Sequence, residues 1–575
     1  MLKKRTISSS LILAILLLCF QSCKQENTNT KNQVIIRVAA DANSLNPLKA
    51  RGEVSNYICM QVFQTLVGYD YENGMPVGII AEEMPTEKKI DSNTSIFTYT
   101  LRNNVRFDST HALSAEDVLF SFKLAICPGI VSSGGANYYE FIDSLIIDPI
   151  NQNQIHIYCH GNYFLNKYFT GDFFILPQFI YDPQNILNQY SIAELRKPDI
   201  LDNNPELNAY IEFFNQSKFE KDKNFIKGSG PYEIADWQSN QRIILQKKKN
   251  WWAAELDSES CLFDQNPPIL QYEIISDNTT ALTALKSNKI DLIKGINAKA
   301  FQELENQTEL KTERVVKCAY DYLAFNCNHD LLKDHSIRKA LAFLVNKQEL
   351  IDKLYFGNAK NALSPISSQQ KDLINSNLIE YTFSMDSTVS ILKANQWTDS
   401  DKNGVLDKTI KGELVELSFD YLFNNNDVVR KSFGIILQSR AKSIGIELNL
   451  IGVEWSSYLE KLKSGDFDLC YGSVSSAPIP PDLYSSFHSK SANGGRNYSN
   501  YQSEEADRLI EAIRNTNSTR QRIKHYHDLQ TIINRDLPKV ILVEPMETFA
   551  YSPQLLPLTT SPIRPNYWAP SIQIK

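Results

Sequence analysis

The stretch from Gly465 to His488 is the part of the chain whose residue types best suit contact with a ligand. Its sequence, GDFDLCYGSVSSAPIPPDLYSSFH, passes from a compact apolar run into a loop of Ser, Pro and Gly. Such a junction delivers backbone groups and small side chains to a surface, and loops held by a rigid scaffold are where binding residues concentrate. The pattern alone also fits a strand that ends in an ordinary solvent loop.

Two patterns have the residue types of a metal site but not the required spacing. Residues 399–407, DSDKNGVLD, resemble the first part of an EF-hand loop, yet the twelfth position is Ile410, so the bidentate glutamate is missing. This favours a structural turn. His525 and His527 are two residues apart on a predicted helix and do not share a face. We therefore expect no metal site and no cofactor.

Motifs for common enzyme chemistry are missing from the sequence. It contains no G-x-S-x-G, no H-E-x-x-H and no glycine-rich phosphate loop, and no pair of acids stands out from a solvated surface. We expect no catalytic residues and no enzymatic activity. A cell-surface hydrolase of an unrecognised kind is the weak alternative.

The first 22 residues have the features of a secretory signal. Lys3, Lys4 and Arg5 form a basic start, residues 11–20 are apolar, and Gln21-Ser22 precedes Cys23. The segment resembles a bacterial lipoprotein signal, in which Cys23 becomes the lipidated first residue; a signal cleaved elsewhere is the alternative. The polar residues that follow, to 33, suit a flexible tether.

Length and charge limit the remaining possibilities. A chain of 575 residues suggests about three or four domains or subdomains. Loss of the three basic residues of the signal takes the formal net charge from −7 to −10, and an acidic protein is a poor partner for nucleic acid. No later stretch approaches eighteen apolar residues, the length that would indicate a second membrane span.

The cysteines give no sign of a metal or redox site. Of nine, Cys19 would leave with the signal and Cys23 would be lipidated, so an odd number, seven, would remain. They are scattered, with no C-x-x-C pair, and we expect most to be small buried hydrophobic residues.

Strand and helix patterns alternate along much of the chain. In the first half they predict a strand at 34–40, a helix at 56–66, a strand at 96–106, a helix opened by Ser114, an irregular or helical insertion at 181–224, a hairpin within 228–252, and a helix and short strand at 279–295. In the second half they predict strands at 320–326, 413–421, 447–453, 467–471 and 540–543, and helices at 336–356, 428–444, 455–463, 504–514 and 520–534. The succession from 413 to 471 indicates an α/β domain.

Several short motifs, in order, carry a resemblance that spans nearly the whole mature chain. They are Ser44-Leu-Asn-Pro47, Phe63 to Tyr69, Phe97 to Phe107, Leu113 to Phe122, Gly228-Ser-Gly-Pro-Tyr232, Trp251-Trp252, and Asn326 to Gly357 with Asp334 and Arg338 at the expected places. By these motifs the chain resembles the extracytoplasmic solute-binding proteins of family 5, which include the peptide-binding and nickel-binding proteins of ABC importers.

The resemblance implies an α/β, two-lobed periplasmic-binding-protein-like fold of type II with an extra domain. The expected division is 1–22 signal peptide, 23–33 tether, 34–68 first part of lobe one, 69–170 extra domain packed on lobe one, 171–280 second part of lobe one, 281–534 lobe two, and 535–575 the return to lobe one. Ligand sites commonly form between such lobes, which close around a bound molecule.

The resemblance also implies candidate binding residues on lobe one. Arg51, Gly52 and Glu53 lie where such proteins present a ligand-facing loop; Arg51 could bind a carboxylate and Glu53 a cation, and a solvated turn is the alternative. Tyr138 and Tyr139 match an aromatic contact of the family, with core packing as the equal alternative.

On lobe two, Tyr320 and Tyr322 lie on the strand that lines the cleft, and we expect one to face inward and the other outward by alternation. Peptide binders of this family use a loop carboxylate to hold the ligand's α-amino group. The matching place is near Ala477, preceded by Ser473 and Ser475, and it carries no acid; Asp482, five residues later, could reach the site only if the Pro-rich loop allows it.

The resemblance therefore implies a monomeric binding protein, anchored through Cys23 at the periplasmic face of a membrane. It would capture a small solute, with peptide as the leading class, and deliver it to an ABC permease. A receptor that hands its ligand to a sensor, or a binder of a nickel chelate, haem or a glycan, stays open.

Overall fold

The computed structural model describes residues 32–575 apart from 92, 132 and 257. The predicted signal peptide, the lipidated Cys23 and nearly all of the tether lie outside the described residues. Within them, no helix is both long and apolar enough to cross a membrane.

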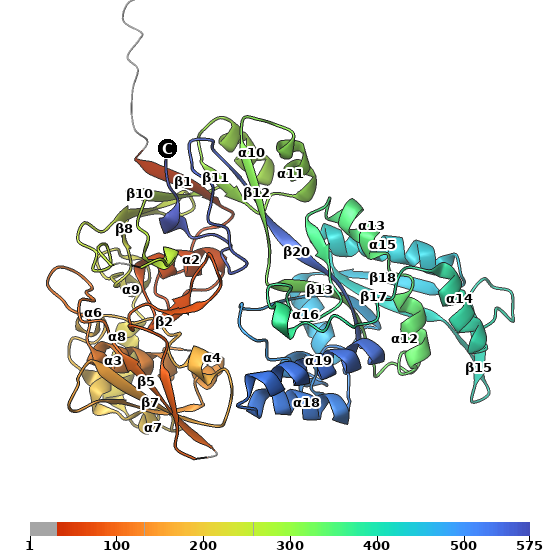
Figure 1. Cartoon of the computed structure of the whole chain (residues 1–575), viewed down its shortest axis with the longest axis horizontal. Coiled ribbons are helices and arrows are strands. Elements are labelled where there is room, and N and C mark those ends of the chain that lie inside the picture. The colour runs from red at the N-terminus through yellow and green to blue at the C-terminus, as the bar shows by residue number, and fades with distance from the viewer. Residues whose placement is uncertain (1–31, 92, 132, 257) are drawn as a thin grey trace, which may run out of the picture.

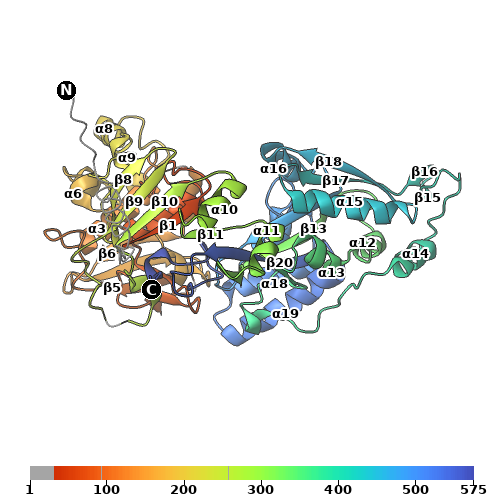
Figure 2. The same ribbon diagram turned by 90° about the horizontal axis from the view of Figure 1, so that it is seen from above.

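One strand, β20 (Lys539–Tyr551), belongs to both halves of the molecule (Figure 1). Its first residues pair antiparallel with β13 (Ala319–Phe325) and β14 (Ala359–Asn361), and its last residues pair with β12 (Lys311–Val316) and β11 (Leu292–Lys294). The result is one 12-stranded sheet with the central order β18-β17-β19-β13-β20-β11-β1-β10-β9-β8. Seen from above, the lobes lie on either side of this strand (Figure 2).

Lobe one is built on the β1 end of the sheet. Its elements are β1 (Gln33–Val38), α2 (Glu53–Val62), β2 (Val67–Tyr69), β3 (Pro76–Gly78), β8 (Tyr232–Gln238), β9 (Arg242–Lys247), β10 (Ile269–Ile274), α10 (Asn278–Lys286), β11, α11 (Ala298–Glu305) and β12. β8 and β9 form the predicted hairpin. β11 pairs with β1, so residues 292–294 lie in lobe one's part of the sheet, and we propose that lobe two begins near 318 rather than at 281.

The Gly-Ser-Gly-Pro turn before β8 is explained by close packing against α2. A Cβ atom on Gly228 or Gly230 would lie 2.2 or 2.5 Å from the main-chain oxygens of Val62 and Gln61. The backbone N–H of Gly230 donates to the Val62 carbonyl at 2.9 Å. These contacts fix the end of α2 against the hairpin, and only glycine fits there.

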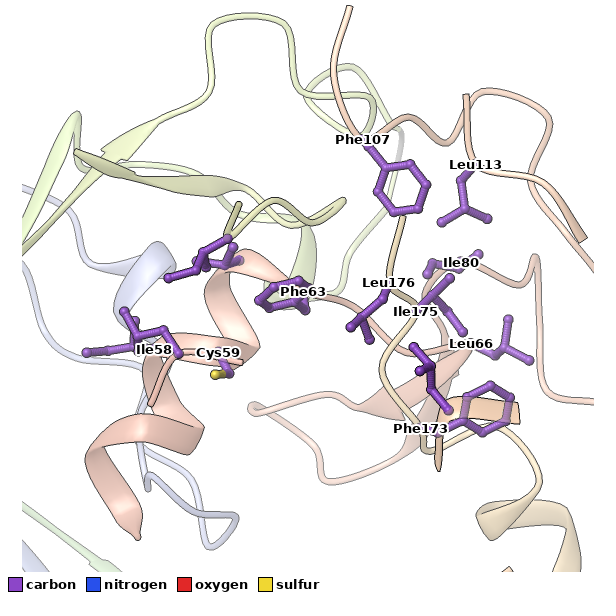
Figure 3. Packing of buried hydrophobic residues seen from close by; sticks show 14 of the residues in the cluster. Ile58, Cys59, Phe63, Leu66, Ile80, Phe107, Leu113, Phe173, Ile175 and Leu176 are labelled. Carbon is purple, nitrogen blue, oxygen red and sulfur yellow. The ribbon is translucent and has the colours of Figure 1, made fainter. Parts of the chain in front are cut away.

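The extra domain is an antiparallel sheet that shares its core with lobe one. The sheet has the order β4 (Thr86–Lys89), β5 (Thr94–Thr100), β7 (Gln154–His160) and β6 (Ile142–Ile147), and α3 (Ala115–Ile126) starts at the predicted Ser114. The insertion at 178–221 contains the short helices α6 (Gln178–Tyr181), α7 (Ile192–Leu195), α8 (Pro205–Phe214) and α9 (Lys218–Lys221). Figure 3 shows Phe63 and Leu66, in the segment that follows α2, beside Ile175 and Leu176 in one continuous core.

Lobe two contains the predicted α/β succession. Its elements include α12 (His335–Ala342), α13 (Lys347–Glu349), α14 (Met385–Ala394), β15 (Asp407–Ile410), β16 (Glu413–Glu416), β17 (Ser418–Asn424), α15 (Val428–Lys442), β18 (Glu447–Val453), α16 (Trp455–Ser464), β19 (Leu469–Ser475), α17 (Tyr484–Phe487), α18 (Glu504–Asn515) and α19 (Thr519–Asp536). The seven described cysteines form no disulfide, and six of them are buried.

Two predicted elements of lobe two are wrong in extent. The single helix expected at 336–356 ends at Ala342, and the Asn346 side chain accepts the N–H of Glu349 at 3.0 Å, which starts a separate turn. The single strand expected at 413–421 is two strands, because β16 turns back onto β15 before the buried Leu417.

Arg338 stabilises the junction between α12 and the end of α19. Its buried guanidinium donates to the carbonyl oxygens of Leu332 at 2.6 Å, Lys333 at 3.0 Å, Asp536 at 2.6 Å and Leu537 at 3.1 Å. One side chain therefore satisfies four main-chain acceptors that belong to two distant segments.

We predict that Arg338→Met lowers the free energy of unfolding by about 3 kcal/mol, because it leaves buried carbonyl groups without donors. Chemical denaturation of the purified protein measures this. Arg520→Met, at an exposed position of α19, is the matched control and should change stability by less than about 0.5 kcal/mol. Equal stability of the two variants would contradict the role given to Arg338.

Candidate functional site

A cavity of about 680 Å³, the main cavity, lies where lobe two meets the extra domain packed on lobe one. Lobe two supplies most of its wall, from β13, α16, the end of β19, the loop that follows it and the start of β20. Tyr163, Leu165 and Phe169 line it from the extra domain. A volume of this size between two domains is typical of a small-molecule site.

Five predicted site residues come together in this cavity: Tyr320, Tyr322, Ser473, Ser475 and Asp482. The expectation that Tyr320 and Tyr322 face opposite ways is wrong. Residues two apart on a strand share a face, and both tyrosines line the cavity with ring centroids 6.0 Å apart.

The ring of Tyr322 reaches across β19 because its partner there is a glycine. Gly472 lies opposite Tyr322 in the antiparallel pairing of β13 and β19. A Cβ atom at Gly472 would lie 2.2 Å from the Tyr322 ring. Gly472, within the stretch 465–488, therefore makes room for the Tyr322 ring at the cavity floor.

Asp482 lines the cavity, but groups of the protein already occupy its carboxylate. Its Oδ2 accepts the hydroxyl of Tyr163 at 2.8 Å and lies 3.3 Å from Nε of Arg514, and its Oδ1 accepts the N–H of Tyr484 at 3.0 Å. Arg514 also lies over the rings of Tyr163 and Tyr484. Asp482 thus joins lobe two to the extra domain.

Arg51, Gly52 and Glu53 do not line this cavity. They form the start of α2, with Gly52 at a φ of 81°. Glu53 forms an ion pair with Lys294 of β11 and accepts the hydroxyl of Tyr57. Arg51 is exposed, and its backbone N–H donates to the Asn43 side chain at 2.8 Å.

Tyr138 and Tyr139 hold a half-buried acid of lobe one, Asp172, that the sequence patterns did not indicate. Their hydroxyls donate to Asp172 at 2.8 and 3.0 Å. Burial raises the pKa of Asp172 to about 7, and the two hydrogen bonds only partly oppose this. Asp172 faces a second cavity of about 210 Å³, and the Tyr138 ring lies 5.5 Å from that of Phe169, which lines the first cavity.

The lining of the main cavity also includes four cations that were not predicted: Arg430, Lys463, Arg496 and Lys539. Lys539 is the one with a signal in the sequence, since it is the charged residue that opens the apolar run 539–543. Lysine is rarely buried without a partner, so a lysine at the start of a buried strand indicates a paired or functional group. Tyr163 gives no such local signal.

The carboxylate cluster at 399–407 is remote from the cavity, on the β15 side of lobe two (Figure 1). The carboxylate oxygens of Asp399, Asp401 and Asp407 lie within 4.8 Å of one another. Asp407 accepts the Ser400 N–H at 2.7 Å, and Asp399 accepts the Gly404 N–H at 3.1 Å, as in the predicted turn. Among the described residues, His525 and His527 belong to no group that could hold a metal.

Comparisons with known proteins agree with this architecture. The family model described as "Bacterial extracellular solute-binding proteins, family 5 Middle" matches residues 76–496. The oligopeptide-binding protein AppA of Bacillus subtilis is 24% identical over 561 residues, covering 94% of this chain and 92% of that protein.

Two solved structures show the same fold. The structure of AppA from Bacillus subtilis in complex with a nonapeptide has a TM-score of 0.68 at 21% identity, covering 94% of this chain and 99% of that chain. NikA from Brucella suis in complex with Fe(III)-EDTA has a TM-score of 0.74 at 18% identity, covering 94% and 100%.

The hydrogen bond from Tyr163 to Asp482 should help to hold the extra domain against lobe two. Tyr163→Phe removes one hydrogen bond to a charged acceptor, about 1.5 kcal/mol, and keeps the ring over Arg514. We expect the ligand-free protein to shift toward a more open arrangement by about tenfold in population. Small-angle X-ray scattering should show a larger radius of gyration.

Tyr168→Phe is the matched control, because its hydroxyl makes no hydrogen bond within the described part of the chain. Its scattering curve should equal that of the wild type. If Tyr163→Phe also leaves the curve unchanged, the contact does not hold the lobes together.

Proposed function

We propose that this chain, which belongs to the bacterial extracellular solute-binding proteins of family 5, captures a peptide between its lobes and delivers it to an ABC permease. The observation that carries the proposal is the cavity of about 680 Å³, which is lined by residues of lobe two and of the extra domain on lobe one. A ligand that contacts both lobes at once favours the closed arrangement, because only that arrangement offers all the contacts.

A free strand edge at the cavity supports a peptide as the ligand. β19 pairs with β13 over its whole length, but on its other side β17 pairs with Leu469 and Cys470 alone. The main chain of residues 473–475 is thus available at the cavity wall on that side. An extended peptide can add to such an edge through main-chain hydrogen bonds, which require no particular side chains.

Relatives support both the leading class of ligand and its alternative. AppA of Bacillus subtilis is named for oligopeptides and is solved with a nonapeptide. NikA from Brucella suis is solved with Fe(III)-EDTA, which keeps a metal chelate as the second candidate. The proposed role is binding without catalysis, in transport or in delivery to a sensor.

The proposed location is the periplasmic face of a membrane, with a lipid on Cys23 as the anchor. The basic and apolar residues before Cys23 and the polar residues after it support this. We predict that Cys23→Ser moves the mature protein from the membrane fraction to the soluble fraction after cell lysis. Retention in the membrane fraction would rule out the lipid as the tether.

The peptide proposal predicts a thermal shift. The protein is unfolded, freed of carried-over ligand and refolded, and then mixed with randomised peptide pools of two to eight residues. Binding at one hundred times Kd stabilises the folded state by about 2.7 kcal/mol and raises the unfolding midpoint. Fe(III)-EDTA and nickel–histidine chelates serve as the comparison. If the chelates raise the midpoint and no peptide pool does, the peptide proposal is wrong.

A further inference from the structure

The main cavity carries an excess of positive charge. Its lining includes the cations Arg430, Lys463, Arg496 and Lys539, and one carboxylate, Asp482. That carboxylate is already paired with Arg514 and hydrogen-bonded to Tyr163. No acid stands at residues 473–477 either. The lobe-two wall is therefore suited to an anionic group rather than to an amine.

Lys539 is the one buried cation among the four that line the main cavity. Its side chain is 3% exposed, and its Nζ lies 4.6 Å from the ring centroids of both Tyr322 and Phe487. The ammonium has three donors, and one makes a 3.3 Å hydrogen bond to the Ser486 carbonyl. No carboxylate among the described residues lies within 4.0 Å of it.

The pKa of Lys539 reflects the free-energy cost of burying its ammonium group. Burial lowers the pKa of Lys539 to about 8, so the group stays mostly charged at neutral pH. A buried charge without a counter-ion is costly, and proteins tolerate it mainly where a ligand or a reaction uses it. The two aromatic rings recover part of that cost.

Two more buried donors of the same cavity lack an acceptor. Nη1 of Arg430 and the hydroxyl of Tyr320 make no hydrogen bond within the described structure, although the Ser486 side chain lies near Tyr320. The guanidinium is held in place from its other side, where Nε lies 3.1 Å from Asp427. Unsatisfied buried donors are rare, and these two share one cavity with Lys539.

Lys539 and Arg430 also act on a common neighbour. Burial raises the pKa of the Cys470 thiol to about 12, and both cations partly oppose that rise. Cys470 lies on β19, two residues before Gly472, where the cavity lining of this strand begins. Both positive groups therefore lie within electrostatic range of this buried side chain.

We propose that the lobe-two wall binds a carboxylate of the ligand through Nζ of Lys539, with the hydroxyl of Tyr320 and Nη1 of Arg430 as further donors. This inference rests on the proposed function and deepens it, since it assigns the charge that the captured solute must present to lobe two. The carboxylate can be the C-terminus of a peptide, an acidic side chain, or part of a metal chelate.

Lys539→Met tests the proposal, because it removes the charge and keeps an apolar stem between the two rings. The probes are the randomised peptide pools of two to eight residues with free C-termini, the same pools as C-terminal amides, and amidated pools without Asp or Glu. Affinity is measured by calorimetry. Lys461→Met, on α16 and outside the cavity lining, is the matched control.

We expect the wild type to bind free-acid pools ten- to a hundredfold more tightly than amidated pools without Asp or Glu. Lys539→Met should lose that preference, and Lys461→Met should keep it. The Lys539→Met protein should unfold at the wild-type temperature or higher, since an uncompensated buried charge is gone. Tyr320→Phe, which loses only one donor, should reduce the preference about threefold.

The remaining outcomes separate the two proposals. If amidated pools that contain Asp or Glu bind as well as free acids and Lys539→Met weakens both, the carboxylate comes from a side chain and the proposal stands. If Lys539→Met keeps the wild-type preference, the inference is overturned while peptide binding stands. If the wild type binds no pool, the peptide function fails, and Fe(III)-EDTA binding that is equal in wild type and Lys539→Met overturns the carboxylate site as well.

Discussion

The pairing of β20 with strands of both lobes is the constraint on which the rest of the structure depends. A 13-residue strand gives its first half to β13 and its second half to β11 and β12, so the lobes are two parts of one hydrogen-bonded sheet. The cavity lies where this shared strand begins, because Lys539 is both the first residue of β20 and part of the cavity floor. Movement of one lobe against the other must therefore change the distances across the site.

Charge is divided between the lobes in a way that bears on the ligand. On lobe one, Asp172 accepts two tyrosine hydroxyls and faces the second cavity, while lobe two presents lysine and arginine to the main cavity. The one carboxylate that lines the main cavity, Asp482, already contacts Tyr163 of the extra domain and Arg514. Electrostatics of this kind decide which end of a solute each lobe accepts, whereas the fold sets only the place where it binds.

Solved structures with the same architecture hold different bound molecules. AppA of Bacillus subtilis, with a nonapeptide, and NikA from Brucella suis, with Fe(III)-EDTA, both superpose on this chain over 94% of its length. At 18–24% identity such likeness shows how the lobes are built and says little about side chains in the cleft. The charged residues of this chain's own cavity are the better guide to its solute.

The sequence by itself determined the local elements. The hairpin of β8 and β9, the strand β18, the helix that starts after Ser114 and the turn at 399–407 follow from periodicity, caps and glycines within about twenty residues. The resemblance of ordered motifs also predicted the two-lobed α/β class, and the family match confirms it. The residue types at 465–488 left a ligand-facing loop and an ordinary solvent loop both open, and in the structure residues 472–477, 479–483, 485 and 486 line the cavity.

Only the tertiary structure decided what that loop does. Asp482 meets Tyr163, 319 residues earlier in the chain, and Lys539 meets the ring of Tyr322, contacts that no local pattern encodes. Arg51 and Glu53 have suitable residue types but lie outside the main cavity, and Glu53 forms an ion pair with Lys294. The physical reason is that a side chain's availability depends on its partners, and in this fold those partners come from strands and loops hundreds of residues apart.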